Sequence, residues 1–230
     1  MSVSAGRDEG QIALESRTYY APVEKEKKYS FYRFVKRTLD IAGAAVGLIV
    51  LSPVLLVISI LIKLDDYKGA VLFHQIRVGI NGREFKMYKF RSMVRDAEQL
   101  LDRLKDQNEI EGAMFKMKND PRVTRIGRFI RKTSIDELPQ LVNVLKGEMS
   151  LVGPRPALPK EVAEYSSYHK QRLLVTPGCT GLWQVSGRSS LSFEEMIELD
   201  LKYIQKRSIF FDLWIILRTV RVLFGSKDAC

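Results

Sequence analysis

The chain has 230 residues, of which 46% are hydrophobic and 28% charged, which excludes a chain disordered throughout and a polytopic membrane bundle. The formal net charge of +10 favours a polyanionic partner: nucleic acid, an anionic membrane surface or a phosphorylated small molecule. Two cysteines, Cys179 and Cys230, and two histidines, His74 and His169, are too few for a disulfide framework or a zinc site. A cytosol-facing chain is therefore the simpler interpretation.

The amino-terminal part of the chain divides into a charged tail and an apolar run. Residues 1–29 have scattered charges and no sustained apolar period, so we interpret them as a flexible tail. Residues 41–62 carry no charge, and as a helix they would span about 33 Å, which is membrane length.

Two features of this run bear on its topology. Basic residues flank both of its ends, so the positive-inside rule has no asymmetry to act on, as expected if both ends face the cytoplasm. Ser52-Pro53 lies near the middle, where proline favours a kink and the serine hydroxyl can bond a freed carbonyl. These residues alone fit a re-entrant helix hairpin and a kinked bitopic span equally well.

The next segment favours a β-hairpin. Strands are predicted near residues 70–77 and 84–91, on either side of an Asn81-Gly82 turn signal. The charged segment 94–109 is helix-favouring, with leucines on one side, and predicts a surface helix.

The carboxyl-terminal half alternates predicted helices with loops. An apolar i, i+3, i+4, i+7 pattern predicts a helix over 137–146, and the Gly- and Pro-rich segments after Gly147 predict ligand-positioning or connecting loops. Further helices are predicted near 160–172, 193–206 and 211–224. The last has arginines and a tryptophan among apolar residues, which fits an interfacial helix and a core helix equally well.

Adjacent carboxylates precede the helix predicted over 137–146. Ser134 to Glu137 matches an S-x-x-E capping box, in which Glu137 would only satisfy a backbone donor, although Pro139 fits that frame poorly. Alternatively, an ionised Asp136 among basic residues is a nucleophile toward phosphorus, and Glu137 is an oxygen ligand for Mg²⁺. Clamps for a diphosphate would come from a set of basic side chains that otherwise form a solvated face near anionic lipid: Lys89, Arg91, Arg131, Arg155 and Arg188.

A series of motifs in fixed order resembles the bacterial sugar transferase family, the monotopic polyprenyl-phosphate phosphoglycosyl transferases. The motifs cover residues 31–224 and are KRTLDI, the SP pair, FxQxRxG, YKFRSM, DPRVTRIGRFIRKTSIDELPQLVNVLKGEMSLVGPRP and PGxTGLWQVSGR. The chain resembles the short forms of the family, which contain the catalytic domain alone.

The resemblance implies an α+β fold with four parts. A flexible tail, 1–29, would precede a membrane-embedded re-entrant helix hairpin, 30–64, that is broken at Ser52-Pro53. A small cytosolic α/β catalytic domain with a β-hairpin and amphipathic interfacial helices would occupy 65–224, followed by a short tail, 225–230.

The resemblance also implies an activity and roles for particular residues. A sugar-1-phosphate, which we expect to be that of galactose or glucose, would pass from a UDP-sugar to undecaprenyl phosphate with release of UMP. Asp136 would attack the β-phosphate and form a covalent phosphosugar intermediate, which the lipid phosphate then resolves, and Glu137 would bind Mg²⁺. Contacts to the diphosphate or the intermediate would come from Lys89, Arg131 and Arg155, with Arg188 and Asp200 as weaker assignments.

The expected location is the cytoplasmic face of the inner membrane, in contact with anionic lipid, and a homo-oligomer is compatible with this expectation. Nucleic acid is excluded as a partner because no recognition-helix, zinc or RNP-like pattern is present in the sequence. The alternative is a membrane-anchored basic scaffold or regulatory protein without catalysis, which explains the anchor and the charge but not the Asp-Glu pair.

Overall fold

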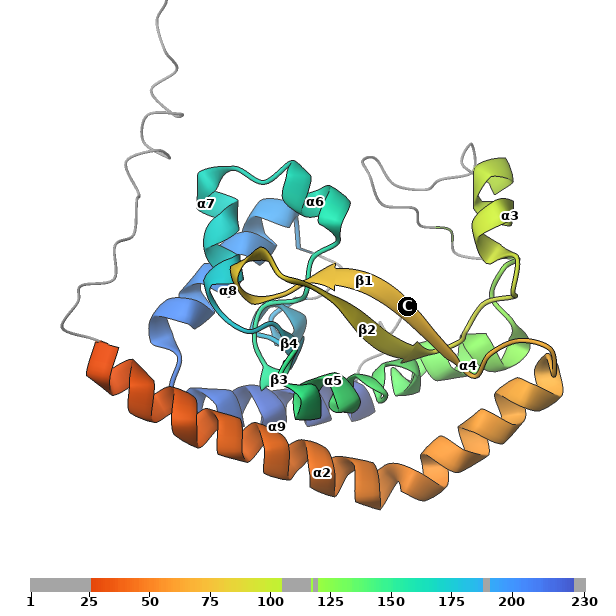
Figure 1. Ribbon diagram of the computed structural model, residues 1–230, viewed down its shortest axis with the longest axis horizontal. Coiled ribbons are helices and arrows are strands. Elements are labelled where there is room, and N and C mark those ends of the chain that lie inside the picture. The colour runs from red at the N-terminus through yellow and green to blue at the C-terminus, as the bar shows by residue number, and fades with distance from the viewer. Residues whose placement is uncertain (1–25, 105–116, 118–119, 188–190, 226–230) are drawn as a thin grey trace, which may run out of the picture.

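The longest element of the computed structural model, which describes residues 26–104, 117, 120–187 and 191–225, is helix α2, Glu26–Asp65. It runs along one side of the molecule and bends in its middle (Figure 1). The helix begins within the segment predicted to be tail, because Glu and Lys at residues 26–28 are good helix formers that extend the apolar helix. The rest of the predicted tail lies outside the described residues.

Helix α2 continues through Pro53, so the predicted break does not interrupt the helix. Proline lacks the N–H that would bond the carbonyl of Ile49 four residues earlier. The Ser52 hydroxyl, as the sequence predicted for a freed carbonyl, donates to that oxygen at 2.7 Å. The helix therefore bends without leaving this carbonyl unpaired.

Both limbs of α2 pack on the rest of the chain. In the first limb Ala44 is buried in a cluster with Met87 and Val144, and in the second limb Ile58 and Ile62 pack in a cluster with buried residues of β2 and α4. Between the limbs several side chains are exposed, among them Ile49 at 72%. Segment Ser30–Asp65 is long and apolar enough to cross a membrane.

The predicted β-hairpin is confirmed. Strand β1, Leu72–Val78, pairs antiparallel with β2, Glu84–Phe90, in the register that places Phe73 opposite Lys89. The connection is a short 3-10 turn, η2, Ile80–Gly82. Asn81 and Gly82 have φ values of 55° and 78°, the left-handed region that these two residue types tolerate best.

Helix α4, Arg125–Lys132, was not predicted from the sequence. Its basic residues interrupt the apolar spacing that would predict a helix. In the structure Ile130 is fully buried and the Thr124 side chain caps the first turn. Gly127 lets this helix approach the hairpin's exit, because a Cβ there would lie 1.9 Å from the Ser92 carbonyl oxygen. Helix α3, Ala97–Leu104, lies within the predicted helix 94–109, whose remaining carboxyl-terminal residues are outside the described part of the chain.

The Gly- and Pro-rich segments contain strands where loops were predicted. Strand β3, Ser150–Val152, pairs parallel with β4, Gly178–Thr180. A Cβ at Gly178 would lie 2.0 Å from the Gly153 nitrogen, so glycine is what allows these backbones to meet. Composition alone suggested loops because such close pairing is a long-range feature.

The helices predicted after residue 137 are present, but some have different bounds from those predicted. Helix α5, Gln140–Lys146, begins later than predicted, because residues 135–137 form a separate 3-10 turn. Segment 160–172 is not one helix, since Ser166 caps a new one. The elements that follow are α6 Pro159–Ala163, α7 Ser167–Lys170, η5 Gln171–Leu174, η6 Trp183–Val185, α8 Phe193–Lys206 and α9 Ile209–Gly225.

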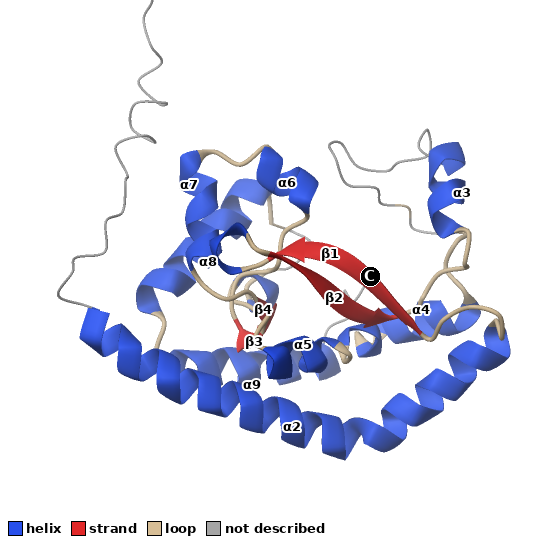
Figure 2. Cartoon of the chain, in the orientation of Figure 1, coloured by secondary structure: helices blue, strands red, loops and turns tan. Residues whose placement is uncertain are grey.

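The coarse fold prediction, a mixed helix and sheet chain with one long apolar amino-terminal helix, is confirmed (Figure 2). Helix α9 combines both of its predicted characters: Ile215 is fully buried, whereas Phe210 and Leu217 are 86% and 70% exposed. The contacts of α2 with α4, α5, β3 and α9 join the apolar helix to the rest of the protein.

Candidate active site

The adjacent carboxylates lie in a tight turn, η4, Ile135–Glu137, between α4 and α5. Ser134 before it has φ 55° and ψ 17°, a left-handed conformation that is uncommon for a residue with a side chain and is enriched at functional sites. Within the described residues the Ser134 side chain makes no capping hydrogen bond. The Glu137 carboxylate instead accepts a 2.7 Å hydrogen bond from Lys89 Nζ, so the capping-box interpretation is wrong.

The two carboxylates have opposite pKa shifts. Burial raises the pKa of Asp136 to about 6, the Glu137 charge adds to this rise, and Lys89 and Arg131 oppose it. Burial also acts to raise the pKa of Glu137, but Lys89, Arg155 and Arg77 outweigh it and hold the pKa below its usual value. At neutral pH Glu137 is a stable anion, whereas Asp136 is a more basic carboxylate that is still mostly ionised. A neighbouring pair with divergent pKa values is typical of a catalytic site.

Three of the predicted basic residues surround the pair. Lys89 reaches Glu137 from β2, and its side chain is 22% exposed. Arg131, in the last turn of α4, and Arg155, just after β3, have exposed side chains and act electrostatically on Asp136 and Glu137, respectively. Elements far apart in the sequence thus place cations around one acidic turn, an arrangement suited to a diphosphate.

The other predicted site residues do not join this group. Arg188 lies outside the described residues. Arg91 forms an ion pair with Asp66 at 3.1 Å and so ties the hairpin to the end of α2. Asp200 is 1% exposed and bonds Arg172 at 2.5 Å, which makes it a buried structural partner rather than a contact to the acidic turn.

No role in the site was predicted for Arg77, the arginine of the FxQxRxG motif. This residue of β1 is 5% exposed, donates to the Pro156 carbonyl and acts electrostatically on Glu137. The signal that could have found it was this motif, in which Arg77 shares a face of the strand with Phe73 and Gln75.

Asp136 and Glu137 supply the hard oxygen donors that suit Mg²⁺. This ion commonly binds through one or two protein carboxylates together with substrate phosphate oxygens and water. Among the described residues there is no group of three or more His, Cys, Asp or Glu side chains that could hold a metal. Glu137, whose side chain is 39% exposed, is the more accessible partner in its ion pair with Lys89.

Comparison with known proteins identifies the family. The bacterial sugar transferase model matches residues 31–226, and the chain belongs to this family. It is similar to galactosyl transferase CpsE of Streptococcus agalactiae, with 51% identity over 223 residues, covering 96% of this chain and 49% of that protein. Undecaprenyl-phosphate galactose phosphotransferase of Salmonella typhimurium is 43% identical over 201 residues, covering 86% of this chain and 42% of that protein.

The exopolysaccharide production protein ExoY of Rhizobium meliloti is similar over most of both chains. It is 40% identical over 218 residues, which cover 93% of this chain and 96% of ExoY. In contrast, the chain spans about half the length of CpsE and of the Salmonella protein.

Proposed function

We propose that this protein transfers a sugar-1-phosphate from a UDP-sugar to undecaprenyl phosphate and thereby begins the assembly of an exopolysaccharide or capsule. The observation that carries the proposal is the acidic turn: a carboxylate with a raised pKa beside an ionised one, with cations from three other elements around them. The names of the similar proteins support the reaction class and the lipid acceptor.

In the proposed first step an Asp136 carboxylate oxygen attacks the β-phosphorus of the UDP-sugar. The bond between that phosphorus and the bridging oxygen breaks, UMP leaves with the bonding electron pair, and a phosphosugar remains on Asp136. In the second step a phosphate oxygen of the lipid attacks the same phosphorus and releases the Asp136 carboxylate.

The surrounding residues stabilise charge in this scheme. Lys89, Arg131 and Arg155 offset the negative charge of the diphosphate and of the departing UMP. Mg²⁺ bound by Glu137 would supply further charge neutralisation at the phosphate oxygens. The Lys89 ammonium also keeps Glu137 ionised, which preserves its capacity to bind a cation.

The proposed reaction is tested by UMP release from protein in nanodiscs with Mg²⁺ and undecaprenyl phosphate. The donors are UDP-galactose, UDP-glucose, UDP-N-acetylglucosamine and a UDP-diacetamido sugar. We expect release with one hexose donor, UDP-galactose first because two of the similar proteins are named for galactose. No release with any donor from demonstrably folded protein would contradict the proposal and favour the non-catalytic scaffold.

We also propose that α2 enters a single leaflet and returns, so that both of its ends lie on the cytoplasmic face of the inner membrane. Support comes from its two limbs, which pack on the same body while the middle of the helix is exposed. A straight crossing would carry one limb away from its packing partners. Phe129 of α4 and Phe210 of α9 are exposed, and the exposed basic residues of α4 suit an anionic lipid surface.

The topology is tested with single cysteines in a chain in which Cys179→Ala and Cys230→Ser remove the native thiols. Ser30→Cys and Lys68→Cys place a thiol near each end of α2. Both are expected to resist a membrane-impermeant maleimide in intact cells and to react after the membrane is opened. Labelling of either one from outside intact cells would contradict the single-leaflet arrangement.

A further inference from the structure

We propose that Arg77 and Arg172 are positioning residues that fix the backbone of the loop carrying Arg155, so that the Arg155 side chain is held ready for the donor diphosphate. This inference rests on the proposed function, because it assigns Arg155 to the phosphate site. Neither arginine needs to contact the substrate for the effect.

Three consecutive carbonyl oxygens of the loop each accept a hydrogen bond from a distant part of the chain. Arg172 Nη2 donates to the Arg155 oxygen at 3.1 Å, and Arg77 Nη1 donates to the Pro156 oxygen at 3.0 Å. The Val78 N–H of strand β1 donates to the Ala157 oxygen at 2.9 Å. Pro156 and Ala157 are buried, whereas the Arg155 side chain is exposed. The loop is thus fixed through its backbone while its cation faces outward.

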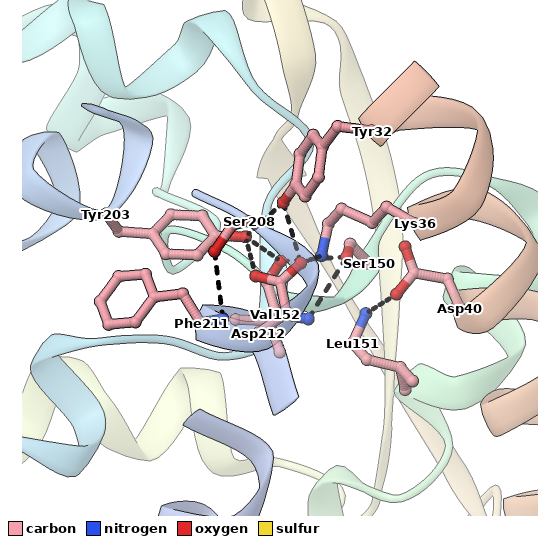
Figure 3. Close-up of polar contacts among 10 residues, drawn as sticks. All are labelled: Tyr32, Lys36, Asp40, Ser150, Leu151, Val152, Tyr203, Ser208, Phe211 and Asp212. Atoms are coloured by element: carbon pink, nitrogen blue, oxygen red, sulfur yellow. Dashed lines mark hydrogen bonds and ion pairs between the residues drawn. The ribbon is translucent and has the colours of Figure 1, made fainter. Parts of the chain in front are cut away.

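The strand that leads into the loop is fixed as well. The Leu151 N–H donates to Asp40 of α2 at 2.9 Å, and the Tyr203 hydroxyl lies 3.1 Å from the Val152 oxygen and 2.8 Å from Asp212 Oδ1 (Figure 3). On its other side the Asp212 carboxylate accepts hydrogen bonds from two residues of α2: Tyr32 and Lys36. The anchor helix and α9 therefore contribute to the rigidity of this segment.

The two buried guanidinium groups use several donors at once. Arg77 donates through Nε and Nη2 to Gln75 Oε1 at 3.1 and 2.6 Å, in addition to its bond to the loop. Arg172 donates to the Tyr165 hydroxyl at 2.8 Å and to Asp200 Oδ2 at 2.5 Å. A lysine cannot reproduce such a planar fork of donors. Asp200, expected to contact the substrate, thus acts on the loop through Arg172.

Arg77 also carries a buried positive charge near the acidic turn. Among the described residues no carboxylate lies within ion-pair distance of it, although it is 5% exposed. Burial, followed by the neighbouring charge of Arg155, lowers the pKa of Arg77 to about 10. The charges of Glu161 and Glu137 act in the opposite direction and favour the charged guanidinium.

The test is a double-mutant cycle on kcat/KM for UMP release. In the wild-type background Arg77→Gln is expected to reduce kcat/KM by about 10- to 100-fold, because a small misplacement of a catalytic group costs this much. In an Arg155→Ala background the same change is expected to cost less than about twofold, since the group that it positions is gone. Equal losses in both backgrounds would mean that Arg77 acts only through general stability, and would overturn the proposal.

Arg122→Gln is the matched control, because Arg122 is 6% exposed and bonds Asp120 and the Ala97 carbonyl. Its effect is expected to be the same in both backgrounds.

If Arg77→Gln does not fold, as judged by its thermal unfolding, Arg172→Lys takes its place with the same expectation. If the wild type releases UMP and Arg155→Ala has the same kcat/KM, this inference alone is overturned. If the wild type releases no UMP, the proposed function is overturned.

Discussion

Asp136→Asn is expected to reduce UMP release by more than about 10³-fold, because an amide cannot attack the β-phosphorus. Hydrogen bonding and side-chain size are nearly conserved, so the substitution removes the reacting oxygen and its charge with little change in packing. The measurement is UMP release with the preferred donor, with and without undecaprenyl phosphate. Release at a rate near that of the wild type would remove Asp136 as the nucleophile.

The stability of this variant provides its control. The pKa of Asp136 is about 6 in the folded protein and ordinarily 3.8, so folding favours the protonated carboxyl. That stabilisation is present below pH 3.8 and is lost as the pH rises through 6. At pH 7.5 the ionised carboxylate thus costs about 1–2 kcal/mol after allowance for partial solvent screening. The asparagine variant should unfold at a temperature no lower than the wild type, which separates lost chemistry from lost fold.

Lys89→Met is expected to lower kcat/KM by about 100-fold, because Lys89 is the cation in direct contact with the acidic turn. The pH profile should change as well. Lys89 lowers the pKa of Asp136, so its removal moves the acidic limb of the profile from near pH 6 to a higher pH. Kinetics between pH 5 and 9 measure both effects.

Lys146→Met is the matched control for this change. Lys146 donates to the Tyr88 hydroxyl at 2.8 Å and lies over the Tyr88 ring, so it is bound to the residue next to Lys89 rather than to the acidic turn. Its loss should leave the acidic limb in place. An unshifted limb in Lys89→Met would contradict the electrostatic role assigned to Lys89.

The local parts of the fold could be predicted from the sequence. The Asn81-Gly82 turn with alternating flanks predicted the hairpin, and the predicted range of α8 agrees with the structure. In the candidate site, Asp136 and Glu137 stood out as adjacent carboxylates among basic residues. These features depend on short-range spacing and on turn chemistry, which the sequence displays directly.

Features that depend on distant partners could not be predicted. The pairing of β3 with β4 requires the close approach of Gly153 and Gly178, and composition alone does not show which glycines meet. Asp200 was assigned to substrate because its ion pair with Arg172 is visible only in three dimensions. For the same reason Arg77 was missed, since its role depends on a carbonyl far along the chain.

The central claim is tested most directly by trapping the covalent intermediate. Protein in nanodiscs is mixed with UDP-sugar labelled in its β-phosphate, without undecaprenyl phosphate, and then denatured and separated from small molecules. We predict label on the wild type that is released by hydroxylamine, as for an acyl phosphate, or by adding the lipid before denaturation, and no label on Asp136→Asn. Label retained on Asp136→Asn, or no label on a wild type that releases UMP, would contradict the account.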